Sequence, residues 1–139
     1  EISHLIMFDF VSPGLLPVWL AEGVAQLKEQ RRRAFTPQVI QAAVRTGKLL
    51  PFSDFLSMDL KTERDTQRVI LFYAQSHSLV EFLLAQYGED RFQRFCQSLH
   101  EGKTVSAAFA TAYSSVIPSF AALDQQWRKH VYKNFGGSL

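Results

Sequence analysis

The sequence predicts one all-α domain, and three observations favour that class. Apolar residues, among them 12 phenylalanines, recur at helical spacing along the 139 residues. The chain has no convincing alternating run longer than four residues, and no Asn-Gly or Asp-Gly hairpin sequence. Its prolines and glycines stand where helices begin and end. A chain of this length buries a substantial core as a single domain.

Capping signals set the expected helix boundaries. Thr36-Pro37 places a capping hydroxyl before a proline suited to the first helical position. Thr104 is expected to cap another helix, and Gly88 and Gly102 occupy positions typical of left-handed helix ends. We expect helices at 1–10, 17–33, 36–46, 62–87, 89–101, 104–113 and 118–134, and a short helical turn at 53–57.

Composition and charge exclude several classes of protein. Hydrophobic residues make up 47% and charged residues 20% of the chain, which argues against disorder. A net charge of +2 is too small to suggest a nucleic-acid partner. The longest nearly uncharged stretch, residues 11–21, is short and interrupted by prolines, so we expect no membrane span. We assign residues 1–135 to one helical lobe and 136–139 to a flexible tail.

The expected helix at 62–87 is the longest and carries a broad apolar stripe, so it is predicted to be central. Two hydroxyl groups, those of Tyr73 and Ser76, interrupt that stripe. A buried hydroxyl without a partner costs about 1–3 kcal/mol. We therefore expect both groups to have hydrogen-bond partners or to face a cavity.

Several other residues favour structural interpretations. The run Arg31-Arg32-Arg33 is expected to end a helix, where cations interact favourably with the negative pole, with a patch for an anionic partner as the alternative. Cys96 and His100 stand one helical turn apart, but without a second pair a buried thiol is the preferred interpretation. Trp19 and Trp127 are expected to pack in the core.

Three residues near the start form a candidate constellation. Glu1 and His4 share one face of the first expected helix. Glu22 lies in an otherwise apolar segment, where a carboxylate is costly to bury unless it is paired or bound to a cation. The neighbouring Gly23 removes side-chain bulk and allows another backbone or a ligand to approach closely.

These residues resemble a known metallopeptidase pattern. Glu-Ile-Ser-His, residues 1–4, resembles the last four residues of an HExxH zinc motif, and Trp-Leu-Ala-Glu-Gly-Val-Ala, residues 19–25, resembles the segment that supplies the third ligand in gluzincins of the peptidase MA-like group. The resemblance implies that Glu1 is the general base, His4 the second zinc ligand and Glu22 the third. It places the first histidine directly before Glu1, so we expect a chain truncated inside the motif.

A second segment extends the resemblance. Residues 72–80, Phe-Tyr-Ala-Gln-Ser-His-Ser-Leu-Val, are similar to the Tyr-Glu-Lys-Gly region of zinc aminopeptidases. Tyr73 matches the tyrosine that stabilises the oxyanion, with a core tyrosine as the alternative, and Ser76 stands where the glycine is. His77 is a candidate for substrate contact, although a helix-surface histidine is the preferred interpretation. Ala21 replaces an asparagine and argues against an aminopeptidase-type amine site.

The sequence is compatible with two functions. The first is a fragment of a zinc-dependent metallopeptidase that hydrolyses peptides or proteins, inactive as this chain, with zinc absent or weakly bound and a missing N-terminal part as the other wall of the cleft. The alternative is a non-catalytic helical interaction or scaffold domain derived from the peptidase fold. A truncated lobe is also expected to expose an apolar face around Leu5, Phe8 and Leu20, satisfied by self-association.

Overall fold

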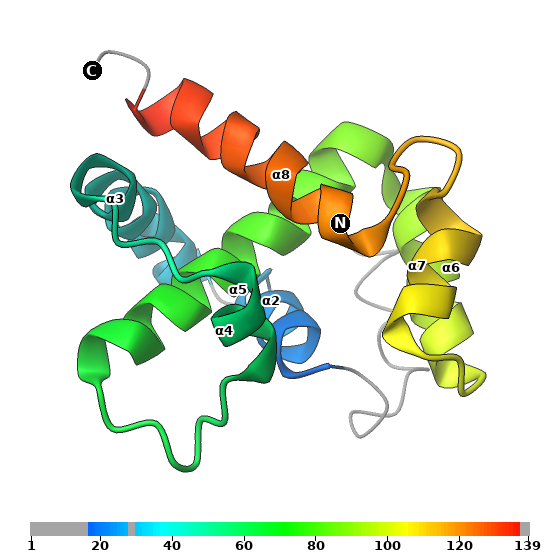
Figure 1. Cartoon of the computed structure of the whole chain (residues 1–139), viewed down its shortest axis with the longest axis horizontal. Helices are drawn as coiled ribbons and strands as arrows, with labels where there is room; N and C mark the ends of the chain where they lie inside the picture. Colours follow the sequence, from blue (N-terminus) through cyan, green and yellow to red (C-terminus); the bar gives the residue numbers. More distant parts are fainter. Residues whose placement is uncertain (1–16, 28–29, 137–139) are drawn as a thin grey trace.

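The computed structural model describes residues 17–27 and 30–136, and within them the chain is helical with no β-strand, as predicted (Figure 1). The elements in chain order are α2 (Val18–Leu27), α3 (Gln30–Thr46), α4 (Phe52–Ser57), α5 (Thr66–Tyr87), α6 (Glu89–His100), α7 (Val105–Tyr113), α8 (Phe120–Val131) and a π-helical turn η2 (Tyr132–Gly136). The expected helix at 1–10 lies outside the described residues.

Helix α5 is the centre of the fold, as its broad apolar stripe predicts. It packs against α2, α3 and α6, and Figure 1 shows it running through the middle of the molecule. It begins later than expected because Asp65 caps it, accepting hydrogen bonds from the backbone N–H groups of Gln67 (2.9 Å) and Arg68 (3.4 Å). Gly88 ends it with φ +90°, a conformation that favours glycine.

Aromatic side chains fill the core between α2, α4, α6 and α8. Trp19 and Trp127 are 2% and 3% exposed, which confirms their predicted core positions. The Trp19 ring lies 6.2 Å from Phe55 and 6.4 Å from Phe95 between ring centroids. Burial of such large rings is the main stabilising contribution to a domain of this size.

The start of helix α3 differs from the predicted one. Thr36-Pro37 does not start a helix, because α3 begins at Gln30 and continues through Pro37 to Thr46. The Thr36 hydroxyl instead contacts His77 of α5, so it is not available to cap the start of a helix. An internal proline costs about 3 kcal/mol, and the buried apolar residues that follow it, such as Ile40 at 1% exposure, offset that cost.

Because α3 begins at Gln30, the run Arg31-Arg32-Arg33 needs another interpretation. Arg31-Arg32-Arg33 lie in the first turn of α3, not at the end of a helix. Cations at this end face the positive pole of the helix, which is unfavourable. The helix dipole therefore does not account for them.

The predicted exposed face is wrong at the residue that the structure describes. Leu20 is 0% exposed and belongs to the core, where α2 packs on α5. Leu5 and Phe8 lie outside the described residues. Self-association through that face stays a prediction.

Candidate functional site

Helices α2 and α5 cross in very close contact at Gly23. A Cβ atom on residue 23 would lie 2.6 Å from the backbone oxygen of Ser76 and 2.5 Å from Cγ2 of Val80. Both distances are shorter than real Cβ atoms show. This confirms the prediction that Gly23 allows another backbone to approach.

Two predicted site residues belong to the helices that cross at Gly23. Glu22 directly precedes Gly23 on α2 and is half-buried. Tyr73 lies three residues before Ser76 on α5, which is less than one helical turn, about 4.5 Å along the axis. Tyr73 is also half-buried, with its ring edge-on to Phe72 at 6.0 Å. A carboxylate and a phenol thus belong to the segments that meet at the crossing.

The other two residues of the motif are not placed. Glu1 and His4 lie outside the described residues, so the convergence of His4 and Glu22 on one metal stays a prediction. Within residues 17–27 and 30–136, no group of three or more His, Cys, Asp or Glu side chains is arranged to hold a metal ion. Glu22 is therefore the one predicted ligand that lies among the described residues.

Ser76 and His77 are both buried, at 0% and 1% exposure. The Ser76 hydroxyl has no hydrogen-bond partner among the described residues, so of the two expected settings, a partner or a cavity, the first is not found there. The helix-surface interpretation of His77 is wrong. Its Nδ1 atom lies 2.7 Å from the Thr36 hydroxyl of α3, and its Nε2 atom lies 3.5 Å from the Glu81 carboxylate, beyond good hydrogen-bond geometry.

Thr36 is thus a residue that the sequence interpretation missed at this site. Its hydroxyl ties α3 to α5 across 41 residues of sequence. Such a contact has no local signal, and the neighbouring proline favoured a capping role instead.

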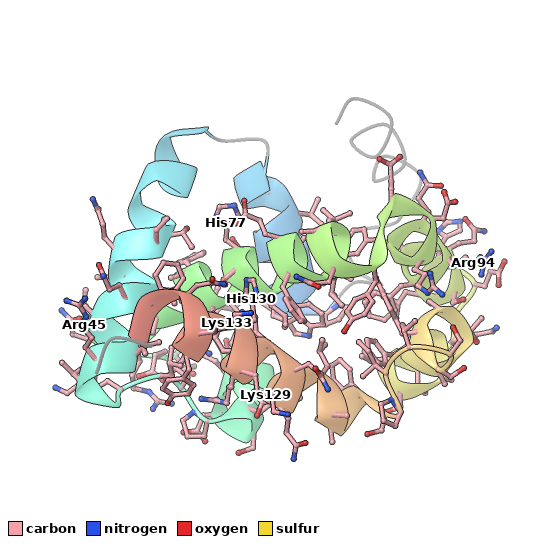
Figure 2. The ribbon with its side chains drawn as sticks, turned by 90° about the horizontal axis from the view of Figure 1, so that it is seen from above. Arg45, His77, Arg94, Lys129, His130 and Lys133 are labelled. Atoms are coloured by element: carbon pink, nitrogen blue, oxygen red, sulfur yellow. The ribbon has the colours of Figure 1, made fainter. Side chains whose placement is uncertain are left out.

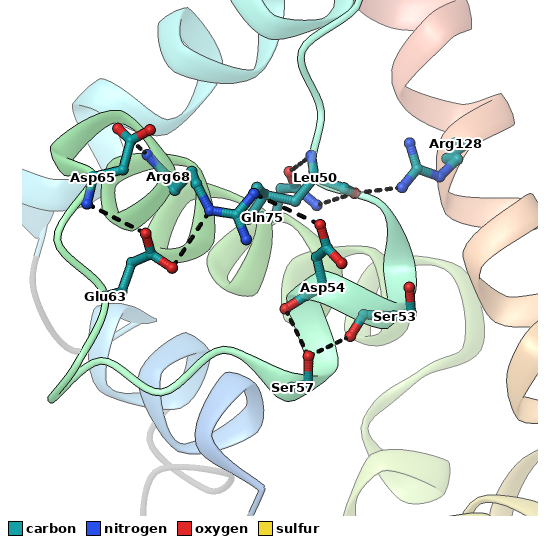
Figure 3. A network of polar contacts seen from close by, with 9 residues as sticks. All are labelled: Leu50, Ser53, Asp54, Ser57, Glu63, Asp65, Arg68, Gln75 and Arg128. Carbon is teal, nitrogen blue, oxygen red and sulfur yellow. Dashed lines mark hydrogen bonds and ion pairs between the residues drawn. The ribbon is translucent and has the colours of Figure 1, made fainter.

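The segment of α5 around Tyr73 is anchored on further sides. The Gln75 side chain accepts a hydrogen bond from the Leu50 backbone N–H at 2.7 Å, and Arg128 of α8 donates to the Leu50 carbonyl at 2.6 Å (Figure 3). Trp127 donates through Nε1 to the Ser78 hydroxyl at 2.9 Å. These bonds join α5 to α8 and to the α3–α4 connection, and they fix the backbone segment that follows Tyr73 to its neighbours.

Cys96 is a buried core thiol, as preferred from the sequence. It is 0% exposed, and burial raises the pKa of its thiol to about 12. Metal binding and nucleophilic attack both need the thiolate. Cys96 is therefore not part of a reactive site.

Comparison with protein-family models matches residues 1–133 to the peptidase MA superfamily. The chain belongs to that superfamily. Membership agrees with the resemblance carried by residues 1–4 and 19–25, and it gives the lobe a metallopeptidase-like fold. No curated protein and no solved structure gave a significant match. Among the described residues, no helix has both the length and the apolar character required to cross a bilayer.

Proposed function

We propose that this peptidase MA chain is the helical lobe, residues 1–135, of a zinc-dependent enzyme that hydrolyses peptide bonds. His4 and Glu22 are the second and third zinc ligands, and Glu1 is the general base. Tyr73 donates a hydrogen bond to the oxyanion that develops on the substrate carbonyl. The first ligand is a histidine directly before Glu1, and an N-terminal part forms the other wall of the cleft.

The observation that carries this proposal is the family match over residues 1–133, which includes Glu1, His4, Glu22 and Tyr73. The position of Glu22 supports it further. Glu22 is half-buried beside a helix crossing where residue 23 has no room for a side chain. The residues of α2 around Glu22 are mostly apolar. In such surroundings a bound cation offsets the cost of burying a carboxylate.

The donor types suit zinc. Imidazole and carboxylate are the ligands that catalytic zinc sites use, with one position left open. When bound, zinc acts as a Lewis acid and activates water for attack on the peptide carbonyl. Of this set, only Glu22 lies in the described residues.

The chain's own groups have distinct tasks in this scheme. Glu1 accepts a proton from water and passes it to the leaving amine. The Tyr73 hydroxyl donates toward the developing negative charge, and the bonds of α5 to its neighbours hold that tyrosine in position. Contact of substrate with Ser76 or His77 stays a prediction, since both side chains are buried in this structure.

Hydrolysis of a quenched fluorescent peptide tests the proposal. The assay uses a polypeptide that carries a histidine directly before Glu1, loaded with zinc. Glu1→Gln should lower the rate by about 100-fold or more and leave the zinc content unchanged. Tyr73→Phe should lower kcat by roughly 100- to 1000-fold.

Tyr132→Phe is the matched control, because Tyr132 is 45% exposed on η2. It should hydrolyse the peptide as the parent does. Zinc uptake without hydrolysis would favour the non-catalytic scaffold function. Hydrolysis that survives Glu1→Gln would contradict the assigned general base.

A further inference from the structure

Charge is unevenly distributed over this nearly neutral chain. Residues 30–50 and 120–136 contain eight of the 15 lysines and arginines but one of the 13 acidic residues, an excess of seven cations. The rest of the chain has seven cations and 12 acidic residues, an excess of five negative charges. The two basic stretches lie together in space, because α3 packs against α8 and η2.

The described side chains of these stretches form a cationic surface, which consists of Arg45, Lys48, Arg128, Lys129 and Lys133. Figure 2 shows Lys129 and Lys133 on α8 and η2, and Arg45 on α3. The hydrogen bond from Arg128 to the Leu50 carbonyl brings α8 next to the connection that carries Lys48. The surface is thus built from segments far apart in the sequence.

Most of the described cations on this surface have no ion-pair partner among the described residues. Asp124, the one acidic residue of the two stretches, is paired with Arg128 at 2.9 Å. Arg45, Lys48, Lys129 and Lys133 are exposed, and none forms an ion pair with a described carboxylate. Partial burial lowers the pKa of His130, and the charge of the nearby Lys133 lowers it further. Exposed cations without internal partners are available to an external anion.

The surface does not suit a membrane or a long nucleic acid. The surface itself contains no large hydrophobic side chain, and Tyr132 is the one exposed residue of that kind beside it; the others in the described chain lie on α2, α4, α5 and the α7–α8 connection. A membrane surface requires apolar groups that insert beside the cations. A nucleic acid longer than this surface would meet the negative remainder of the chain, which repels phosphates.

We infer that the cationic surface binds an acidic stretch of a polypeptide. A short run of aspartate or glutamate side chains matches several cations at once and ends before the negative remainder begins. The assignment of this polypeptide as substrate rests on the proposed peptidase function. The binding itself does not, because it requires neither zinc nor hydrolysis.

Fluorescence anisotropy tests the inference. The probe is a short fluorescein-labelled peptide that alternates glutamate and glycine, with a glutamine version as the neutral comparison. Binding to the full chain is measured in the presence of a chelator, which removes any contribution from zinc or cleavage. The acidic peptide should bind and weaken with added salt, and the glutamine peptide should not bind.

The decisive comparison is between two variants of equal charge. Arg45→Gln/Lys48→Gln/Lys129→Gln/Lys133→Gln removes four cations from the surface and should raise Kd at least about tenfold. Lys61→Gln/Arg64→Gln/Arg94→Gln/Lys103→Gln removes four exposed cations elsewhere and should change Kd less than about twofold. Arg94 lies at the opposite end of the molecule from Arg45 in Figure 2. Circular dichroism melts check that both variants fold.

Three outcomes would overturn the inference. The first is absence of binding to the acidic peptide. The second is an equal loss of affinity in the two variants, which would indicate a response to net charge alone. The third is binding to phosphatidylserine vesicles or oligothymidylate without binding to the peptide. None of these outcomes bears on zinc uptake or hydrolysis, so a failure here is distinct from a failure of the proposed function.

Discussion

Gly23 of α2 lies against the backbone carbonyl of Ser76 in α5, so closely that a Cβ atom would stand 2.6 Å from that oxygen. The contact fixes the crossing of the two helices. It also fixes where Glu22 and Tyr73 stand along those helices, and so it links the packing of the lobe to the proposed chemistry.

Gly23→Ala is expected to destabilise the fold by about 1–3 kcal/mol, because the added methyl group meets backbone that has no room to move. In an unconstrained helix the same change stabilises by up to about 1 kcal/mol. The sign of the change in the free energy of unfolding, measured by urea denaturation, therefore shows whether residue 23 lies in a close crossing or in an unconstrained helix. Adding Val80→Ala should restore only part of the loss, since the Ser76 carbonyl stays in place. A stabilised Gly23→Ala protein would contradict the close crossing.

Thr36→Val tests the bond between α3 and α5. It keeps the side-chain shape but leaves Nδ1 of the buried His77 without its 2.7 Å partner. The expected cost is about 1–3 kcal/mol, read as a lower midpoint in urea. Thr111→Val is the control, because that exposed hydroxyl bonds only locally, to Thr111's own helix and to Lys103. Equal effects of the two substitutions would show that the contact with His77 adds nothing.

Local signals predicted much of the fold, and long-range contacts account for most of what was missed. Both ends of α6 and the start of α7 follow from Gly88, Gly102 and the Thr104 cap, which accepts a hydrogen bond from the Ala107 N–H at 3.1 Å. Residues within one turn of a helix end determine such caps. The start of α3 was missed because Thr36 is engaged by His77, and nothing local reports that contact.

In the candidate site, too, local signals predicted some residues and long-range contacts explain those that were missed. Glu22, Gly23 and Tyr73 could be selected from the sequence, because a carboxylate in an apolar segment and a hydroxyl in an apolar stripe are local anomalies. The burial of His77 could not, because it depends on how α3 covers α5. The cationic surface was missed for a similar reason. Its residues come from two stretches that only the packing of α3 against α8 and η2 unites.

Cys96 should resist modification by a thiol reagent such as Ellman's reagent in the native protein. The thiol is fully buried, and burial raises its pKa to about 12. Little thiolate is therefore present at about pH 8. The native rate should be at least about 100-fold below that of the urea-unfolded chain. Rapid reaction of the native protein, at a rate independent of denaturant, would contradict the burial of Cys96.

His130 gives the fold a small pH dependence. Partial burial against Phe82 and the charge of Lys133 both lower its pKa in the folded protein. The unfolded chain therefore binds the proton more tightly, and stability falls as pH drops below the ordinary histidine value of 6.5. His130→Gln should remove about 1–2 °C of the fall in Tm between neutral and mildly acid pH. His100→Gln, at the exposed end of α6, should leave the pH profile of Tm as in the parent.

Zinc content tests the central claim, that Glu22 is a metal ligand of a peptidase MA site, most directly. The chain with a histidine directly before Glu1 is loaded with zinc, dialysed and analysed by atomic emission, beside Glu22→Ala and the exposed control Glu101→Ala. The account predicts about one zinc per chain in the parent and the control, and almost none in Glu22→Ala. Full zinc retention in Glu22→Ala, or no zinc in any of the three proteins, would contradict it.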